Sequence, residues 1–227
     1  MSANIGAHDM ATADPVFNDD KVTVLLNTTP SPEPGPTVSV PAGGSCAPSG
    51  RAGTIALALG EGGQPSGEVS LSLTSSNQAL VPTSNIGFAG SGDTQSLTVR
   101  PVAGRNSTAV ITVNRLSDGQ LTGSIPVTVR VAANGANSVV GDAGADILFG
   151  QNGAVTLAGL GGNDLLCGGN GADQLSGGEG DDTLDGGRGP DGLGGGPGAV
   201  RFFGGPGKDQ ASDFSPAEGD SQDGTVP

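Results

Sequence analysis

The chain has 227 residues, 23 acidic and 9 basic side chains, a net charge of −14, and no tryptophan or tyrosine. This length accommodates one or two domains but no large enzyme core. The negative charge repels nucleic acid and anionic membranes and attracts cations, which argues against a nucleic-acid-binding protein. The longest apolar runs fall far short of the roughly 20 residues that span a bilayer, so we expect no membrane span.

The first predicted segment, residues 1–36, is a flexible tail with a proline-rich linker. Its start, MSANIGAHDMATADP, has neither a basic region nor an apolar region of the secretory type, so we expect no classical signal peptide in it. Its end, NTTPSPEPGP, carries alternating prolines. Such prolines favour an extended polyproline II linker, and a floppy tail is the alternative.

Residues 37–134 carry short β-type runs separated by turn residues, and we predict a β-sandwich of six or seven strands. The expected strands are TVSV (37–40), TIALAL (54–59), EVSLSLT (68–74), SLTVRPV (96–102), TAVITVNRL (108–116) and SIPVTVRVA (124–132). Apolar Ala109, Ile111 and Val113 alternate with polar residues. This alternation of period two is typical of antiparallel strands with one buried face and one wet face.

The stretch SSNQALVPTSNIGFAGSGDTQSLTVRPVAGRNSTAVITVNRLSDG resembles the Ig-like or cadherin-like modules of large bacterial extracellular proteins. The shared elements are SSN…LVP, GSG…LTV and AVITV…SDG. The resemblance implies a spacer or adhesive module and no chemistry. A short linker, residues 135–140, is expected to follow.

Residues 141–212 are eight consecutive nonapeptides: GDAGADILF, GQNGAVTLA, GLGGNDLLC, GGNGADQLS, GGEGDDTLD, GGRGPDGLG, GGPGAVRFF and GGPGKDQAS. Glycine fills positions one and four in all eight, and position eight is always apolar. Such a fixed period is the signature of a repeat fold. Position six is aspartate in six repeats: Asp146, Asp164, Asp173, Asp182, Asp191 and Asp209.

The pattern GGxGxDxUx, where U is a large apolar residue, resembles the hemolysin-type (RTX) calcium-binding repeats. The resemblance implies a parallel β-roll in which GGxGxD forms a turn, xUx forms a strand, and two nonapeptides make one 18-residue coil. The fold class is then all-β, a sandwich followed by a roll. The turn backbone expected at the metal belongs to Gly144, Gly162, Gly169, Gly171, Gly178, Gly180, Gly187, Gly189, Gly205 and Gly207, where glycine permits positive φ.

Carbonyl and carboxylate oxygens make a hard cage that suits Ca²⁺ better than zinc or copper, and the single histidine, His8, lies in the tail. Successive turns alternate between two edges of the roll, so aspartates 18 residues apart should face the same gap. The intact pairs are Asp146–Asp164, Asp164–Asp182, Asp173–Asp191 and Asp191–Asp209. We therefore predict about four calcium sites, with weak or empty positions at Val155 and Val200.

Glycine-rich turns lose much conformational entropy on folding, and the eight modest side chains at position eight recover too little of it. The stacked aspartates also repel one another. We therefore expect the roll to fold only when calcium binds. Flexible sites of this class suit the calcium concentration outside the cell, so we expect an extracellular or cell-surface location.

The outward strand positions, seven and nine, are apolar near the start of the odd repeats, at Ile147, Phe149, Leu165 and Cys167. In the even repeats they are polar or small. The apolar face around Phe149 and Leu165 is interpreted either as packing against the linker or sandwich, or as a cell-surface or self-association surface.

Two features stay open at this stage. Cys46 and Cys167 form one long-range disulfide or are two unrelated thiols. The acidic tail, residues 213–227, resembles the segment that closes such repeats, and Glu218 falls at position six of a degenerate ninth repeat.

No catalytic constellation is evident, because His8 is the only histidine and neither HExxH nor GxSxG occurs. We therefore predict a secreted, non-enzymatic calcium-binding structural or surface protein. The alternatives are a C-terminal accessory or secretion module of a larger RTX enzyme or toxin, and an adhesin that uses the Ig-like module.

Overall fold

The computed structural model describes residues 37–41, 43–48, 51–60, 69–91, 94–133 and 138–226. The described residues form strands and two short 3₁₀ helices, η1 (Thr83–Asn85) and η2 (Pro216–Glu218), and contain no α-helix. No helix within these ranges has the length and hydropathy of a membrane span. The predicted tail and linker of residues 1–36 lie outside the described residues. The predicted all-β class is confirmed.

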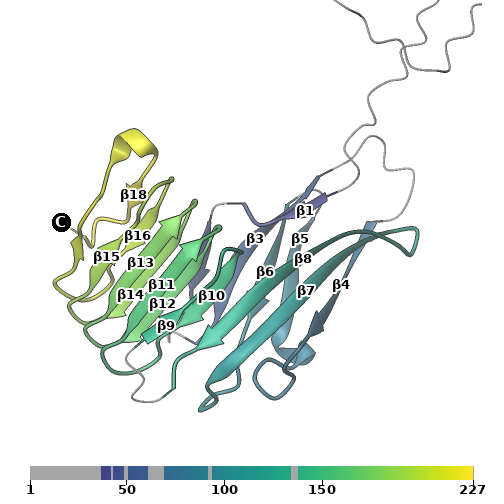
Figure 1. Cartoon of the computed structure of the whole chain (residues 1–227), viewed down its shortest axis with the longest axis horizontal. Helices are drawn as coiled ribbons and strands as arrows, with labels where there is room; N and C mark the ends of the chain where they lie inside the picture. The colour runs from purple at the N-terminus through teal and green to yellow at the C-terminus, as the bar shows by residue number, and fades with distance from the viewer. Residues whose placement is uncertain are drawn as a thin grey trace, which may run out of the picture. The chain divides into compact units, whose positions relative to one another are not determined.

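The N-terminal part contains an antiparallel sheet of five strands in the order β1-β3-β6-β5, with β2 also paired to β3 (Figure 1). Its strands are β1 (Thr37–Ser39), β2 (Gly44–Cys46), β3 (Gly53–Gly60), β5 (Ile86–Ser91) and β6 (Thr94–Val99). The predicted runs at 37–40, 54–59 and 96–102 fall on β1, β3 and β6. Strands β2 and β5 were missed because serine and glycine interrupt their hydrophobic pattern.

The second sheet has eight strands in the order β18-β16-β14-β12-β10-β8-β7-β4. Its antiparallel part is β4 (Val69–Ser75), β7 (Ser107–Ser117) and β8 (Gln120–Val131). Its parallel part is β10 (Asp146–Phe149), β12 (Leu165–Asn170), β14 (Thr183–Arg188), β16 (Arg201–Phe203) and β18 (Ser221–Gln222). Strand β8 pairs with β7 on one side and, in parallel, with β10 on the other. The two regions of the chain thus share one continuous sheet.

The even repeats build a third sheet, in the order β17-β15-β13-β11-β9. Its strands are β9 (Ser138–Val140), β11 (Thr156–Gly161), β13 (Gln174–Glu179), β15 (Gly192–Gly194) and β17 (Gln210–Ala211). Pairing joins residues 18 apart, as in Leu157 with Leu175, so the predicted 18-residue coil is confirmed. Residues 138–140 of the predicted linker form β9, which pairs with β11.

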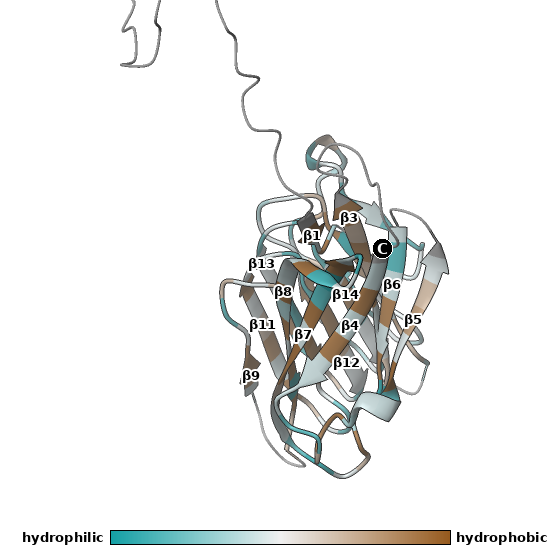
Figure 2. Cartoon of the chain, turned by 90° about the vertical axis from the view of Figure 1, so that its right-hand side faces the viewer, coloured by the Kyte–Doolittle hydropathy of each residue, from teal (hydrophilic) through white to brown (hydrophobic). Residues whose placement is uncertain are grey.

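The chain builds two hydrophobic cores on opposite faces of the shared sheet. One core lies inside the roll and consists mainly of the apolar residues at position eight, such as Leu148, Leu166 and Leu184, which are fully buried. The other lies between the antiparallel layers, where Ala109, Ile111 and Val113 are fully buried as predicted. Hydrophobic segments recur along the strands of both layers in Figure 2. The likeness of this N-terminal part to Ig-like modules stays a prediction.

The apolar face of the odd repeats belongs to the second core. Phe149 is 1% exposed and Leu165 is fully buried, against side chains of the N-terminal part. A Cβ added to Gly53 of β3 would lie 2.9 Å from carbons of both Ile147 and Leu165, so only glycine lets β3 approach this closely. The expectation of a partner surface around Phe149 and Leu165 is therefore wrong, and the packing alternative is confirmed.

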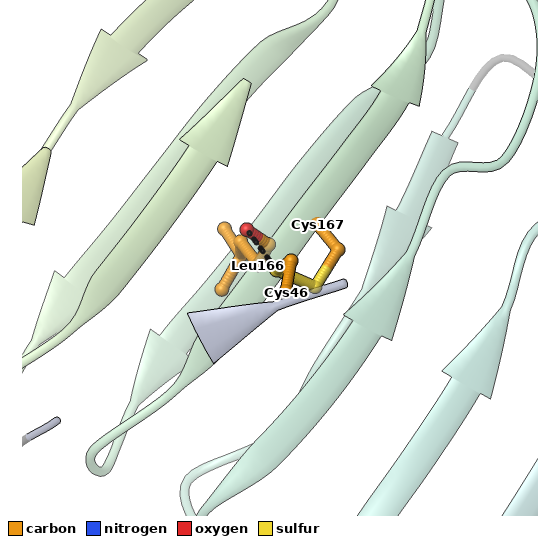
Figure 3. Close-up of a disulfide and its surroundings, with 3 residues drawn as sticks. All are labelled: Cys46, Leu166 and Cys167. Atoms are coloured by element: carbon orange, nitrogen blue, oxygen red, sulfur yellow. Dashed lines mark hydrogen bonds between the residues drawn. A yellow bond between two sulfur atoms is a disulfide. The ribbon is translucent and has the colours of Figure 1, made fainter. Parts of the chain in front are cut away.

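A disulfide joins the N-terminal part to the roll. Cys46 of β2 and Cys167 of β12 are bonded across 121 residues, with their Cα atoms 5.8 Å apart (Figure 3). Cys46 Sγ also lies 3.8 Å from the carbonyl oxygen of Leu166. The question that the sequence left open is thereby answered in favour of one bridge.

Removal of this bridge should destabilise the protein by about 2–4 kcal/mol, because the cross-link restricts a long loop in the unfolded chain. We expect the Cys46→Ala/Cys167→Ala variant to unfold at lower denaturant than the oxidised protein, both in saturating calcium. Reductant should lower the midpoint of the parent protein and leave that of the variant unchanged. Equal midpoints for the oxidised parent and the variant would contradict this role.

Candidate calcium-binding ladder

The six aspartates at position six stack along the two edges of the roll. All six are buried, with exposures of 0–3%. In five of them, Oδ1 accepts a hydrogen bond from the backbone N–H of the residue 18 positions earlier. The donor–acceptor pairs are Asp146–Asp164, Val155–Asp173, Asp164–Asp182, Asp173–Asp191 and Asp191–Asp209, at 2.8–3.0 Å. The structure thus brings together all four pairs that the repeat spacing predicts, although their sharing of an ion stays a prediction.

The second oxygen of each carboxylate is buried and has no hydrogen-bond partner. These atoms are Asp146 Oδ1 and the Oδ2 atoms of Asp164, Asp173, Asp182, Asp191 and Asp209. A buried unpartnered carboxylate oxygen costs much free energy unless a charge of opposite sign lies close to it. The ladder therefore presents a row of buried oxygens that a cation or a bound proton must compensate.

Backbone carbonyls lie beside these oxygens. A Cβ added to Gly159 would collide with Asp164 Oδ2 and would lie 2.5 Å from the carbonyl oxygen of Gly177. The same test at Gly168 finds the Gly186 carbonyl at 2.5 Å and Asp173 Oδ2 at 2.7 Å. The first glycine of a repeat thus leaves open a space bounded by oxygens from two successive coils.

The donor set fits calcium. Among the described residues, no cluster of three or more His, Cys, Asp and Glu side chains could hold a metal by side chains alone. Backbone carbonyls lie beside the carboxylates and would serve a cation as further ligands. Ca²⁺ accepts such all-oxygen cages of irregular geometry, whereas zinc and copper prefer nitrogen and sulfur.

Two slots at position six lack a carboxylate, as the sequence indicates. Val155 and Val200 are buried in the core of the roll. A Cβ added to Gly195 would lie 2.8 Å from a methyl carbon of Val200, so this methyl fills the space that an aspartate oxygen has in other turns. A weak or empty position at these two slots stays a prediction.

Eight of the ten predicted turn glycines have positive φ, from +84° to +152°. They are Gly162, Gly169, Gly171, Gly178, Gly180, Gly187, Gly189 and Gly205. Gly144 and Gly207 do not have positive φ, so the expectation is wrong there. These two lie in the first and last repeats, where the stack of turns ends.

Burial raises the pKa of five of the ladder carboxyls, because the low-dielectric interior disfavours the charged form. The pKa of Asp146, Asp182 and Asp191 rises to about 6, and that of Asp164 rises to about 8. At Asp164 the charges of Asp182 and Asp146 raise the pKa further, and the bond from the Asp146 N–H opposes the rise. Burial also raises the pKa of Asp173.

Several contributors to the ladder escaped sequence reasoning. The predicted slot of a ninth repeat at Glu218 is wrong, because Glu218 is exposed in η2. Asp220 takes that place, with its Oδ1 accepting the N–H of Val200 at 2.9 Å. The register shifts to 20 residues there, so counting by nine misses it.

At the other end, Arg130 contacts Asp142 and Asp146. Extending the 18-residue spacing backwards would have revealed Arg130.

Gly178 tests the stacking directly. Its φ is +113°, and a Cβ there would collide with the backbone carbonyl of Leu160 in the preceding coil. We expect Gly178→Ala to destabilise the folded roll by at least about 2 kcal/mol. Gly87→Ala is the matched control, because nothing lies within 4 Å of a Cβ at Gly87. Denaturant unfolding in calcium measures both, and equal losses would contradict the stacking argument.

The raised pKa values predict how the metal-free roll responds to pH. The folded carboxyls hold protons up to about pH 6–8, whereas unfolded aspartates release them near 3.8. The stability from these groups is therefore greatest below about pH 4 and is lost as the pH rises through 6–8. Metal-free protein should show more β structure by circular dichroism at pH 5 than at pH 8.5. The calcium concentration at the midpoint of the folding transition should fall as the pH rises from 5 to 8.5. A metal-free roll that gains order as the pH rises would contradict the prediction.

Comparison with known proteins agrees with this geometry. The family model described as RTX calcium-binding nonapeptide repeat (4 copies) matches residues 131–166, 140–175 and 158–193. The search of curated proteins found no match, and the search of solved structures found none either. The N-terminal antiparallel part therefore has no identified relative. The chain carries RTX calcium-binding nonapeptide repeats, and they form a parallel β-solenoid with aspartate ladders that imply calcium binding.

Proposed function

We propose that this chain is a secreted, non-enzymatic structural or surface protein whose roll becomes ordered when calcium binds outside the cell. The observation that carries the proposal is the row of buried carboxylate oxygens without partners. Each of them is held in place by its sister oxygen, which binds the backbone of the neighbouring turn or, at Asp146, of its own turn. In the folded roll, the backbone thus holds each unpartnered oxygen in a fixed orientation.

Calcium would supply the positive charge that these oxygens lack, and about four sites are proposed on the four aspartate pairs. Without it, the folded state must either keep the carboxyls protonated or bury repelling charges. At neutral pH the second condition holds for Asp146, Asp182 and Asp191, whose pKa is about 6, so the metal-free roll is the less stable form. Folding and ion binding are then one event.

The location follows from the affinity expected of such sites. Extracellular calcium modules bind at roughly 10⁻⁴–10⁻³ M, far above the free calcium inside cells. The disulfide between Cys46 and Cys167 supports the same location, because structural disulfides persist in oxidising compartments. The roll would therefore be unfolded before export and folded afterwards.

The absence of enzymatic activity is part of the proposal. The ladder aspartates are only 0–3% exposed, so their carboxyls offer no surface at which a substrate could exchange a proton. His8, the single histidine, lies outside the described residues. A rigid spacer or surface element is the use that remains for a stack of this kind.

A calcium titration of the full chain, followed by far-UV circular dichroism, tests the proposal. We expect a cooperative gain of β signal with calcium and none with equal magnesium. Asp182→Asn removes the negative charge of a carboxylate whose Oδ2 is buried without a hydrogen-bond partner. Calcium affinity at that turn should therefore fall at least about tenfold, which corresponds to about 1.4 kcal/mol of binding free energy. Glu218→Gln, which makes the same carboxylate-to-amide change at an exposed residue of η2, is the control and should match the parent in calcium affinity. A spectrum that ignores calcium would refute the proposal.

A further inference from the structure

Strand β8 continues the register of the roll one coil upstream of the first repeat. In the parallel pairing of β8 with β10, Thr128 lies opposite Asp146, and Arg130 lies opposite Leu148. Each partner is 18 residues away, which is one coil. Thr128 thus takes the slot of an aspartate at position six, and Arg130 takes position eight, which is apolar in all eight repeats.

Asp146 is oriented differently from the other five ladder aspartates. Its Oδ2 accepts a hydrogen bond from the backbone N–H of Asp142 in its own repeat, at 2.7 Å. The N–H of Thr128, which would otherwise donate to the carboxylate, donates to the carbonyl oxygen of Ala145 at 3.1 Å. The free oxygen of Asp146, Oδ1, therefore points toward β8 and not toward a preceding turn.

The group that meets this oxygen is the guanidinium of Arg130. Its Nε lies 3.6 Å from Asp146 Oδ1, and its Nη2 lies 2.8 Å from Asp142 Oδ2. Thr128 Oγ1 donates to the same Asp142 oxygen at 3.4 Å. The Arg130 Nε is buried and has no hydrogen-bond partner, so the carboxylate of Asp146 is the anion that it faces. Only 25% of the Arg130 side chain is exposed, and that of Asp146 is fully buried.

We infer that Arg130 is a built-in cation that does, between β8 and the first coil, what calcium does between later turns. The inference rests on the proposed calcium-dependent folding. A guanidinium tethered to β8 cannot dissociate, so the first strand of the roll stays docked on β8 in the absence of calcium. Later coils then add to this docked strand in the direction of the C-terminus as calcium binds.

The test compares Arg130→Gln with the parent chain and with Arg105→Gln, which removes the same charge at an exposed turn of the N-terminal part. In chelator, amide exchange by NMR should show protection at Ile147–Phe149 in the parent and in Arg105→Gln, and none in Arg130→Gln. The calcium midpoint of Arg130→Gln should rise about threefold, because loss of the guanidinium leaves the buried carboxylate of Asp146 uncompensated. The number of bound ions, counted by calorimetry, should not change.

The outcomes separate this inference from the function on which it rests. A parent chain that ignores calcium would defeat both. A parent that responds, with Arg130→Gln equal to it in midpoint and protection, would defeat the inference alone, as would the loss of one bound ion in Arg130→Gln. If Arg130→Gln fails to fold even in saturating calcium, Arg130→Lys decides, because it keeps the charge. Protection of Ile147–Phe149 in the lysine variant supports the inference, and its loss refutes it.

Discussion

The structure depends on buried aspartates whose two carboxylate oxygens have different environments. One oxygen of each aspartate binds the backbone of a turn, and the other is buried without a partner. The first contact fixes the spacing of the coils, and the second makes the stack incomplete without positive charge. Glycine at the first position of a repeat that carries an aspartate is needed for the same reason, because a side chain at Gly159 or Gly168 would fill the space beside these oxygens.

Because this constraint is periodic, the sequence predicts it well. The resemblance to RTX repeats implied the parallel coils and the two edges, and the nine-residue period then predicted the aspartate pairs and the apolar interior around Leu148 and Leu184. What it could not predict lies where the period stops. Asp220 joins the ladder after a two-residue shift in register, and Arg130 joins it from an antiparallel strand outside the repeats. The shift hides Asp220 from a count by nine, and Arg130 is found only when the 18-residue spacing is extended back to β8.

The cover of the apolar face could not be predicted either, for a different reason. Period-two alternation says which residues of a strand share a face, but not which element packs on that face. Ile147 and Phe149 were identified as an apolar face, and the choice between a partner and the chain's own N-terminal strands had to come from tertiary contacts. The disulfide between Cys46 and Cys167 is another such contact, since two cysteines 121 residues apart carry no pairing information in themselves.

The shared sheet connects the two cores more tightly than a linker would. In β10, Leu148 points into the roll, whereas Ile147 and Phe149 point into the core of the antiparallel part. A slip of one residue in the pairing of β10 would exchange these faces. Leu148 would then point into the core of the antiparallel part, and Ile147 and Phe149 would point into the roll. The register that stacks the aspartates is therefore the register that packs the N-terminal core. Order gained in the carboxylate ladder must strengthen both cores, because β10 and β12 contribute side chains to both.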